Sequence, residues 1–345
     1  MNFERILVRA TNWVGDAVMS IPALHALRER FPEAHISILA RPWVAGLYGR
    51  EPFCDELIPY DVPSGSRGSW AKWRVSQHLR RRRFDCAILF QNAFEAAALT
   101  WLARVPVRIG YDRDARRWLL TEPIAVPKTG ESPTHQRFYY LELLRRSGII
   151  SGYPPESSII LSGTGEAARK GRLRLQQASL SATIGVAPGA AYGSAKRWAT
   201  ERFAAAAIRI ARERNRDVAV FGSAQESPIS GAVSEAVNAA GVRCVDFSGR
   251  TTLAELIELM AACELCLTND SGSMHIASAL GVPTVAVFGS TDAAATGPVG
   301  PHTRIVQAQN VECSPCLLRE CPIDHRCMSR VETDTVVSVS LNLLK

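Results

Sequence analysis

The sequence predicts an α/β protein built from two doubly wound domains. Short apolar runs typical of buried strands alternate with longer segments of helical periodicity over residues 5–147, and the alternation restarts at residue 183. The chain has 345 residues, about the length of two ordinary domains. Strands that alternate with helices form a parallel sheet covered on both faces, so we expect one such sheet in each half.

The N-terminal half contains five predicted strands and four predicted helices. Residues 5–9 (RILVR) and 86–90 (CAILF) are typical of the strands, and residues 16–31 carry apolar side chains at helical spacing. The predicted strands are 5–9, 35–40, 56–60, 86–90 and 107–111, and the predicted helices are 16–31, 69–83, 93–103 and 132–147.

The C-terminal half repeats this architecture after a stretch rich in Gly, Pro and Ser, residues 148–165, which is the predicted linker. We therefore expect domains over residues 1–165 and 166–345 with a cleft between them, and a terminal helix that could pack back on the first domain. Predicted strands cover 183–187, 217–221, 243–247, 265–268, 284–288 and 303–306, and predicted helices cover 201–214, 227–240, 253–262, 274–280 and 335–344.

The composition indicates a packed globular protein: 47% of residues are hydrophobic and 21% are charged. There is no apolar run of the ~18 residues that a membrane span requires, and the N-terminus lacks the apolar core of a signal peptide. We expect a cytoplasmic protein whose nine cysteines are reduced.

The formal net charge of +7 suits an anionic partner: nucleic acid, anionic lipid or a phosphorylated substrate. Arginines gather at residues 80–83 and again at Arg113, Arg116 and Arg117, and an ordinary solvated face is the alternative interpretation of the first run. No zinc-finger, helix-turn-helix or ribonucleoprotein motif accompanies them, so we do not expect a nucleic-acid partner.

The segment over residues 268–289, TNDSGSMHIASALGVPTVAVFG, reads as a strand end, a polar turn, a helix and a second strand. Asp270, Ser271 and Gly272 fall in the turn, and His275 lies near the helix start. Free N–H groups at a helix N-terminus, at the carboxyl end of a parallel strand, are where open α/β sheets bind phosphates. The segment predicts a nucleotide or sugar-nucleotide site.

A second turn, residues 11–22 (TNWVGDAVMSIP), follows the first strand. Gly15 allows close backbone approach, and Asp16 is placed to act as a general base; a stabilising helix N-cap is the alternative interpretation. The glycines do not match G-x-G-x-x-G, which disfavours a nicotinamide site.

Two loops of the second half add polar candidates. In residues 187–198 (APGAAYGSAKRW), Lys196 can neutralise a pyrophosphate, although a solvated surface lysine is the alternative. The loop does not match G-x-x-x-x-G-K-[ST], so ATP hydrolysis is not indicated. In residues 221–226 (FGSAQE), Glu226 can bond ribose hydroxyls or can simply begin a helix.

Four cysteines lie within fifteen residues near the C-terminus: Cys313, Cys316, Cys321 and Cys327. The first pair has the spacing of zinc ligands, whereas the second pair does not. A structural Zn²⁺ and a loop of reduced cysteines both remain open.

Taken together, these motifs resemble the ADP-heptose:lipopolysaccharide heptosyltransferases of glycosyltransferase family 9 over essentially the whole chain. The resemblance rests on four motifs, which occur in this order: TNWVGDAVMSIPAL, PGAAYGSAKRW, FGSAQE and the segment over residues 268–289. The tail CSPCLLRECPIDHRCM is similar to the type II members. The resemblance implies a GT-B fold of two Rossmann-like domains, with the acceptor on the first and the nucleotide-sugar on the second.

The resemblance also implies a reaction: transfer of L-glycero-D-manno-heptose from ADP-heptose to the first heptose of a lipid A-Kdo-heptose acceptor, at the cytoplasmic surface of the inner membrane. It makes Asp16 the base, and Lys196, Glu226, Asp270, Ser271, Gly272 and His275 the donor-binding residues. The acceptor's anions give the basic residues a use: Arg67, Arg113, Arg116 and Arg117 are candidates for the acceptor, and residues 80–83 for the membrane surface.

The expected chemistry is a single displacement that inverts the anomeric centre, with backbone N–H groups and Lys196 stabilising the departing ADP. No D-x-D motif occurs near the donor residues, so we expect no obligatory metal cofactor. The alternatives are a related family member with another acceptor, a sugar-nucleotide epimerase, or a non-catalytic sugar-nucleotide sensor at the membrane surface.

Overall fold

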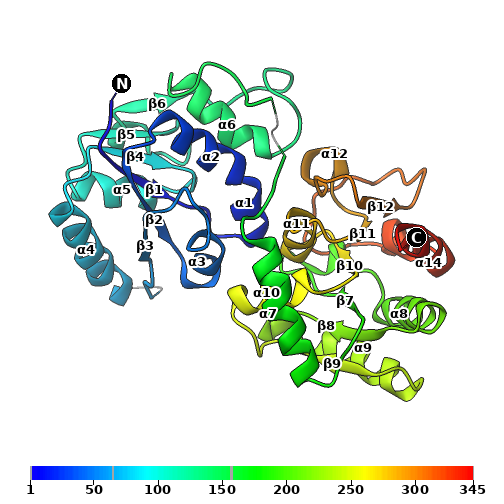
Figure 1. Cartoon of the computed structure of the whole chain (residues 1–345). Helices are drawn as coiled ribbons and strands as arrows, with labels where there is room; N and C mark the ends of the chain where they lie inside the picture. Colours follow the sequence, from blue (N-terminus) through cyan, green and yellow to red (C-terminus); the bar gives the residue numbers. More distant parts are fainter. Residues whose placement is uncertain (1, 64–65, 156–157, 345) are drawn as a thin grey trace. The chain divides into compact units, whose positions relative to one another are not determined.

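The computed structural model describes residues 2–63, 66–155 and 158–344, and it divides into two compact units, Met1–Ser158 and Ile159–Lys345 (Figure 1). Each unit is a parallel six-stranded sheet flanked by helices. The α/β fold class is therefore confirmed. Among the described residues, no helix combines the length and the apolar character that crossing a bilayer requires.

The sheet of the first unit has the strand order β3-β2-β1-β4-β5-β6, and all of its neighbouring strands are parallel. Its strands are β1 (Arg5–Arg9), β2 (His35–Ala40), β3 (Glu56–Pro59), β4 (Cys86–Leu89), β5 (Val107–Tyr111) and β6 (Glu122–Ile124). The order reverses between β1 and β4, so the carboxyl ends of these two strands frame the place where doubly wound sheets bind ligands.

The helices of the first unit differ from the predictions at two places. The helix predicted over residues 16–31 is two helices, because Pro22 lacks the N–H that a continuous helix needs. A short helix that begins at Pro42 was not predicted. The helical segments are α1 (Val14–Met19), α2 (Ile21–Arg30), α3 (Pro42–Tyr48), α4 (Ser66–Arg81), α5 (Phe94–Leu102), the 3-10 turn η1 (Arg117–Leu119) and α6 (Arg137–Arg146).

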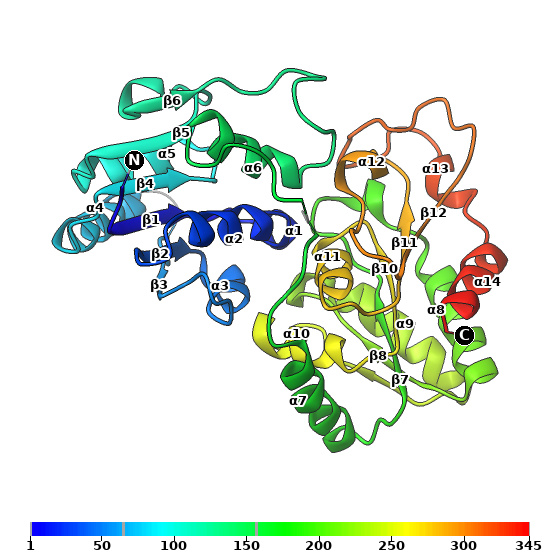
Figure 2. The ribbon, with the colours of Figure 1, turned by 45° about the horizontal axis from the view of Figure 1, so that its top comes forward.

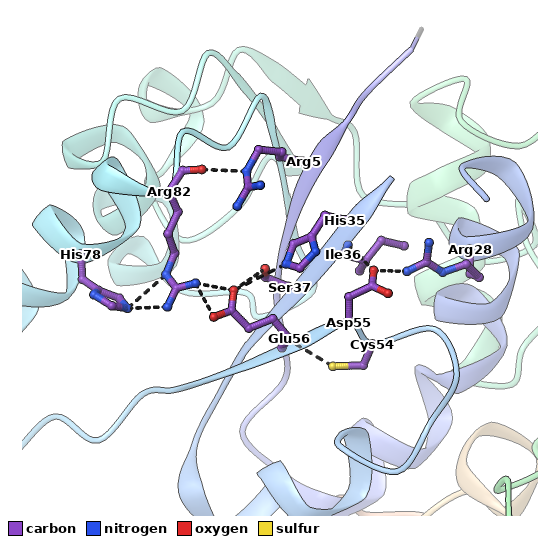
Figure 3. Close-up of polar contacts among 10 residues, drawn as sticks. All are labelled: Arg5, Arg28, His35, Ile36, Ser37, Cys54, Asp55, Glu56, His78 and Arg82. Carbon is purple, nitrogen blue, oxygen red and sulfur yellow. Dashed lines mark hydrogen bonds and ion pairs between the residues drawn. The ribbon is translucent and has the colours of Figure 1, made fainter. Parts of the chain in front are cut away.

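A polar cluster ties helix ends to the starts of β2 and β3 (Figure 3). The Arg82 guanidinium donates to the Glu56 carboxylate, which also accepts from Ser37 Oγ (3.1 Å). Burial acts to raise the pKa of Glu56, but the hydrogen bond and charge of Arg82 outweigh it and lower that pKa. Arg82 therefore has a structural role, and its prediction as a membrane-facing arginine is corrected. The other three arginines of residues 80–83 are exposed.

The second unit repeats the topology with the strand order β12-β11-β10-β7-β8-β9. Its strands are β7 (Thr183–Ala187), β8 (Asp217–Val220), β9 (Cys244–Asp246), β10 (Leu265–Asn269), β11 (Thr284–Phe288) and β12 (Thr303–Gln307). Its helical segments are α7 (Thr164–Gln177), η2 (Ser194–Lys196), α8 (Thr200–Arg214), η3 (Ala224–Glu226), α9 (Ser227–Ala239), α10 (Leu253–Ala261), α11 (Gly272–Ala279), α12 (Ala293–Thr296), α13 (Arg326–Ser329) and α14 (Thr333–Leu343). Here the order reverses between β7 and β10.

Two helix pairs flank the second sheet. Helices α7 and α10 lie side by side in both ribbon views, and α14 packs on α8 (Figures 1 and 2). Helix α7 was not predicted. The terminal helix, which the sequence left open to pack on the first domain, contacts α8 and β10–β12 of its own unit. Its apolar side contributes Val336 and Val337 to the core of this unit.

Candidate functional site

In the second unit, a buried asparagine joins the carboxyl ends of β7 and β10. Asn269 Oδ1 accepts from the Trp198 backbone N–H (3.0 Å), and Asn269 Nδ2 donates to the Pro188 carbonyl (2.7 Å). Asn269 is fully buried and Trp198 is 1% exposed, so these bonds are shielded from water. They fix the loop over residues 188–198 above the point where the strand order reverses.

Lys196 and Asp270 meet at this point. Lys196 Nζ lies 2.6 Å from Asp270 Oδ2, and the two side chains are 13% and 4% exposed. Thr291 Oγ1, which follows β11, donates to the same carboxylate oxygen at 2.5 Å. The lysine is therefore held by a nearly buried ion pair and is not a solvated surface side chain. Its ammonium has three donors, of which Asp270 takes one.

The first turn of α11 presents backbone N–H groups beside this pair. The N-cap residue Ser271 makes no side-chain cap, and Ser271 and Gly272 are half-exposed. The N–H groups at the start of a helix have no intrahelical acceptor, so this turn can receive a phosphate. His275 lies one turn further on and is 4% exposed.

Glu226 closes the other side of the β7 loop. Its Oε2 accepts from the backbone N–H and the hydroxyl of Ser223, both at 2.8 Å, as part of a capping box. Its Oε1 lies so close to Gly189 that a Cβ at that glycine would be 2.3 Å away. Glu226 therefore does lie at a helix start, and the same carboxylate also borders the loop that carries Lys196.

The C-terminal tail braces this loop from outside. The Ala195 N–H donates to the Arg319 carbonyl (2.9 Å), and the Tyr192 hydroxyl donates to the Leu317 carbonyl (2.9 Å). Two cations lie near the Tyr192 ring, with Lys196 Nζ at 4.9 Å and the Arg319 guanidinium at 5.3 Å from its centroid. A Cβ at Gly193 would be 2.1 Å from the Arg319 carbonyl, so only glycine fits there.

The four tail cysteines gather in the same segment. Burial, followed by the charges of Cys313, Cys316 and Cys321, raises the pKa of the Cys327 thiol. All four are free thiols. Within the part of the chain that the structure describes, no group of three or more His, Cys, Asp or Glu side chains is arranged to hold a metal ion.

In the first unit, Asp16 lies at the carboxyl end of β1. It is the third residue of α1, whose N-cap is Trp13, so the N-cap interpretation of Asp16 is wrong. Asp16 Oδ1 accepts a hydrogen bond from the hydroxyl of Tyr140 on α6 (3.0 Å). Tyr140 is 3% exposed and Asp16 is half-exposed. A carboxylate held on one side and accessible on the other suits a general base.

Polar side chains continue along this edge of the first sheet. The Asn12 N–H donates to Gln91 Oε1 (3.1 Å), which links the ends of β1 and β4. Arg9, 2% exposed, donates to Asn12 Oδ1 (2.9 Å), and its guanidinium lies 4.7 Å from the Tyr60 ring centroid. Burial lowers the pKa of Arg9 to about 10. This edge of the first sheet is therefore polar and carries a buried cation.

The acceptor arginines expected from the sequence have different environments. Arg116 is fully buried and donates to the Tyr111 and Gln91 carbonyls and to Asn92 Oδ1, at 3.0, 2.5 and 2.8 Å. Its guanidinium is committed to the fold, so its assignment to the acceptor is corrected. Arg113 and Arg117 have side chains that are 47% and 69% exposed. The side chain of Arg67 lies outside the described residues.

Sequence reasoning missed three residues of these edges: Tyr140, Thr291 and Arg137. Arg137 lies one turn before Tyr140 on α6, it is half-buried, and its Nε is buried with no hydrogen-bond partner among the described residues. Burial lowers the pKa of Arg137. A helical pattern was the only signal around Tyr140 and Arg137, so nothing in the sequence distinguished these two side chains from ordinary helix residues.

Comparison with known proteins identifies relatives over nearly the whole chain. The model of glycosyltransferase family 9 (heptosyltransferase) matches residues 72–326. Lipopolysaccharide heptosyltransferase 2 of Salmonella typhimurium is 30% identical over 308 residues, which cover 88% of this chain and 88% of that protein.

Solved structures agree with this result. The structure of the Escherichia coli ADP-heptose LPS heptosyltransferase II is 27% identical, has a TM-score of 0.83, and is matched over 99% of this chain and 98% of that one. A family 9 glycosyl transferase from Veillonella parvula, 22% identical, has the same fold with a TM-score of 0.83 over 99% of this chain and 97% of that one.

Proposed function

The chain belongs to glycosyltransferase family 9, the heptosyltransferase family, and from this premise we propose that it transfers L-glycero-D-manno-heptose from ADP-heptose to the first heptose of the lipopolysaccharide inner core. The observation that carries the proposal is the polar cluster at the ends of β7 and β10. There the Lys196 ammonium, the N-terminus of α11 and the Glu226 carboxylate lie around the loop over residues 188–198. This set of groups suits a nucleoside diphosphate attached to a sugar.

The donor residues have separable roles in this proposal. Lys196 and the first turn of α11 neutralise the charge that develops on ADP as the C1–O bond of the sugar breaks. Asp270 holds the lysine in place and keeps its remaining donors directed at the phosphates. Glu226 bonds ribose hydroxyls through the oxygen that borders Gly189.

Asp16 acts as the base. The acceptor hydroxyl transfers its proton to the Asp16 carboxylate while its oxygen attacks C1 of the heptose, and ADP leaves with the electron pair of the broken bond. Attack opposite to the leaving group inverts the configuration at C1. Arg113, Arg117 and Arg137 are the basic residues that we assign to the phosphate and carboxylate groups of the lipid A-Kdo-heptose acceptor.

Product analysis with ADP-heptose and core acceptors that bear one heptose or none tests this function. Transfer to the mono-heptose acceptor is the expected result, and the anomeric configuration of the product reports inversion. Transfer only to the heptose-free acceptor identifies a family member with another acceptor. If ADP-heptose is bound but not consumed, the protein is a sensor. If ADP-heptose is isomerised, the protein is an epimerase.

The base assignment is tested by Asp16→Asn. We expect kcat to fall by about 10²- to 10⁴-fold, the usual contribution of a general base, while ADP-heptose binding is retained because Asp16 belongs to the acceptor unit. Asp61→Asn, at an exposed aspartate of the same unit, is the matched control. Near wild-type turnover of Asp16→Asn removes Asp16 as the base.

We propose that the reaction needs no obligatory metal, because Lys196 and the α11 turn supply the positive charge at the leaving group. Activity retained in excess EDTA is the expected result. Metal analysis of the purified protein separately decides whether Cys313, Cys316, Cys321 and Cys327 hold a structural Zn²⁺. A protein that contains one Zn²⁺ per chain and still transfers heptose supports a structural metal.

We also propose that the protein docks on the inner membrane through one face of α4, defined by Trp70, Trp73, Arg74 and Arg81. These residues share a face by helical spacing. Trp70 and Trp73 are 60% and 45% exposed and stack on each other with centroids 4.7 Å apart. Helix α4 contains no acidic residue. Tryptophan beside cationic side chains suits the headgroup region of an anionic bilayer.

A further inference from the structure

The hydrogen bond between Tyr140 and Asp16 joins two distant parts of the first unit. The residues are 124 positions apart in sequence, and the Tyr140 hydroxyl donates to Asp16 Oδ1 at 3.0 Å. Tyr140 comes from α6 and Asp16 from α1. Helix α6 itself packs on α2, the helix that follows α1.

Packing fixes where the Tyr140 hydroxyl lies. Its ring contacts Phe90 at the end of β4, with centroids 5.3 Å apart, and meets Tyr139 edge-on at 5.8 Å. The side chain is 3% exposed. A buried aromatic ring between two others has little rotational freedom, so its hydroxyl is a fixed donor and not one that adapts to its acceptor.

The hydroxyl also stays protonated. Burial and then the nearby Asp16 carboxylate raise the pKa of Tyr140 well above its ordinary value. Another titratable group whose charge acts on it is Tyr48 from α3, whose pKa burial raises to about 12. Neither tyrosine titrates near neutral pH, so the donor is constant there.

We propose that Tyr140 is a positioning residue for the base: its hydroxyl holds the Asp16 carboxylate in the one orientation from which it accepts the proton of the acceptor hydroxyl. This inference rests on the proposed role of Asp16. Without the hydroxyl, the half-exposed carboxylate loses a hydrogen bond that orients it, and the fraction of time that it spends in the reactive geometry falls. A displacement of about 1 Å at a reacting group costs up to 10²-fold in rate.

The test is Tyr140→Phe, which keeps the ring and removes the hydroxyl. The matched control is Tyr153→Phe, because Tyr153 also donates from its hydroxyl to a carboxylate of α6, Glu142 Oε2 at 2.6 Å. Both variants lose one tyrosine-carboxylate hydrogen bond within the same unit, but only Tyr140→Phe loses it at Asp16. Circular dichroism and thermal unfolding establish that both are folded.

We expect Tyr140→Phe to lower kcat by about tenfold to 10²-fold with the KM for ADP-heptose unchanged, and Tyr153→Phe to leave kcat within about twofold. The acidic limb of the kcat/KM profile moves to higher pH in Tyr140→Phe, because the variant no longer stabilises the charged carboxylate. An unchanged kcat and profile in Tyr140→Phe, or an equal loss in Tyr153→Phe, overturns the proposal.

A double-mutant cycle separates this inference from the proposed function. If Tyr140 acts through Asp16, Tyr140→Phe has no further effect on the residual rate of Asp16→Asn. An equal loss in both backgrounds means that Tyr140 acts elsewhere. If Asp16→Asn transfers heptose at the wild-type rate, the base assignment is refuted. If transfer depends on Asp16 but is unchanged in Tyr140→Phe, only the positioning role is refuted.

Discussion

At the scale of single residues, the ion pair between Lys196 and Asp270 has an energetic consequence. Both side chains are nearly buried, and removing one partner of such a pair leaves an uncompensated charge that costs about 3–5 kcal/mol. Asp270→Asn therefore perturbs the lysine as well as the aspartate. A loss of activity in that variant reports on Lys196 placement and is not evidence that Asp270 touches substrate.

Arg137 offers the cleanest test of acceptor recognition. Its guanidinium is half-buried and forms no ion pair with a carboxylate of the described residues, so an anionic ligand is the natural counter-charge. We expect Arg137→Ala to raise the KM for the acceptor by about tenfold to 10²-fold, equivalent to ~1.5–3 kcal/mol for a hydrogen bond to a charged group, and to leave the KM for ADP-heptose unchanged. Steady-state kinetics with each substrate varied checks this. Arg209→Ala, at an exposed arginine of the second unit, is the control; equal KM values in Arg137→Ala and wild type argue against the assignment.

At the scale of elements, α6 is held by a buried carboxylate that makes stability depend on pH. Burial acts to raise the pKa of Glu142, but hydrogen bonds from Arg145, Tyr153 and Arg146 outweigh it and lower the pKa from 4.5 to about 2. Because the folded-state pKa is the lower one, the contribution is complete above about pH 4.5 and is lost as the pH falls towards 2. The shift corresponds to about 3 kcal/mol.

We therefore expect Glu142→Gln to destabilise the protein at pH 7 by roughly that amount, and the difference from wild type to shrink between pH 4.5 and 2. Chemical unfolding followed by tryptophan fluorescence at several pH values measures it. Glu166→Gln, at an exposed ion pair on α7, should leave the free energy of unfolding nearly unchanged, because solvent screens an exposed pair. A wild-type and Glu142→Gln difference that is constant with pH contradicts the interpretation.

The loop that carries Lys196 depends on a second element, the C-terminal tail. A Cβ at residue 193 meets the Arg319 carbonyl at 2.1 Å, so Gly193→Ala must displace the loop or the tail, at a cost of about 1–3 kcal/mol for overpacking. We expect the Kd for ADP to rise about tenfold, measured by titration calorimetry. Gly165→Ala has open space at its Cβ and serves as the control. An unchanged affinity for ADP in Gly193→Ala would mean that the tail does not support the donor site.

Sequence reasoning predicted the elements better than their contacts. Strands such as Arg5–Arg9 and Thr284–Phe288 were predicted to the residue, because apolar β-branched runs are a local signal. Helix α7 was missed because its 14 residues are mostly polar, with few apolar positions to reveal a period. The contacts of Tyr140 with Asp16 and of Arg319 with Ala195 join residues more than 120 positions apart. Only the folded topology brings such pairs together, so no local pattern could predict them.

At the scale of the whole molecule, the positive charge is concentrated in the first unit. Residues 1–158 contain 22 Lys and Arg against 16 Asp and Glu, whereas residues 159–345 contain 18 against 17. The unit that we assign to the acceptor therefore carries nearly all of the net charge. It is also the unit with the tryptophan-bearing face of α4.

We expect the protein to bind phosphatidylglycerol-containing vesicles and to bind phosphatidylcholine vesicles weakly. Two double variants, Trp70→Ala/Trp73→Ala and Arg74→Gln/Arg81→Gln, should each weaken binding to the anionic vesicles by about tenfold or more. Each cation near such a surface contributes ~1 kcal/mol, and tryptophan side chains anchor in the headgroup region. Co-sedimentation measures both. Trp43→Ala, at an exposed tryptophan of α3, is the control. Wild-type binding by both double variants excludes this face of α4.

The bracing of the Lys196 loop by the tail also sets an order of events during biosynthesis. The first unit contains all six strands of its sheet within residues 1–158 and can assemble as soon as they leave the ribosome. The lysine loop emerges long before Leu317 and Arg319, whose carbonyls accept its hydrogen bonds. A nascent chain of 300 residues thus contains every side chain that we assign to the donor, but not the tail carbonyls that hold the Lys196 loop. In our proposal, the nucleotide site is complete only when synthesis is almost finished.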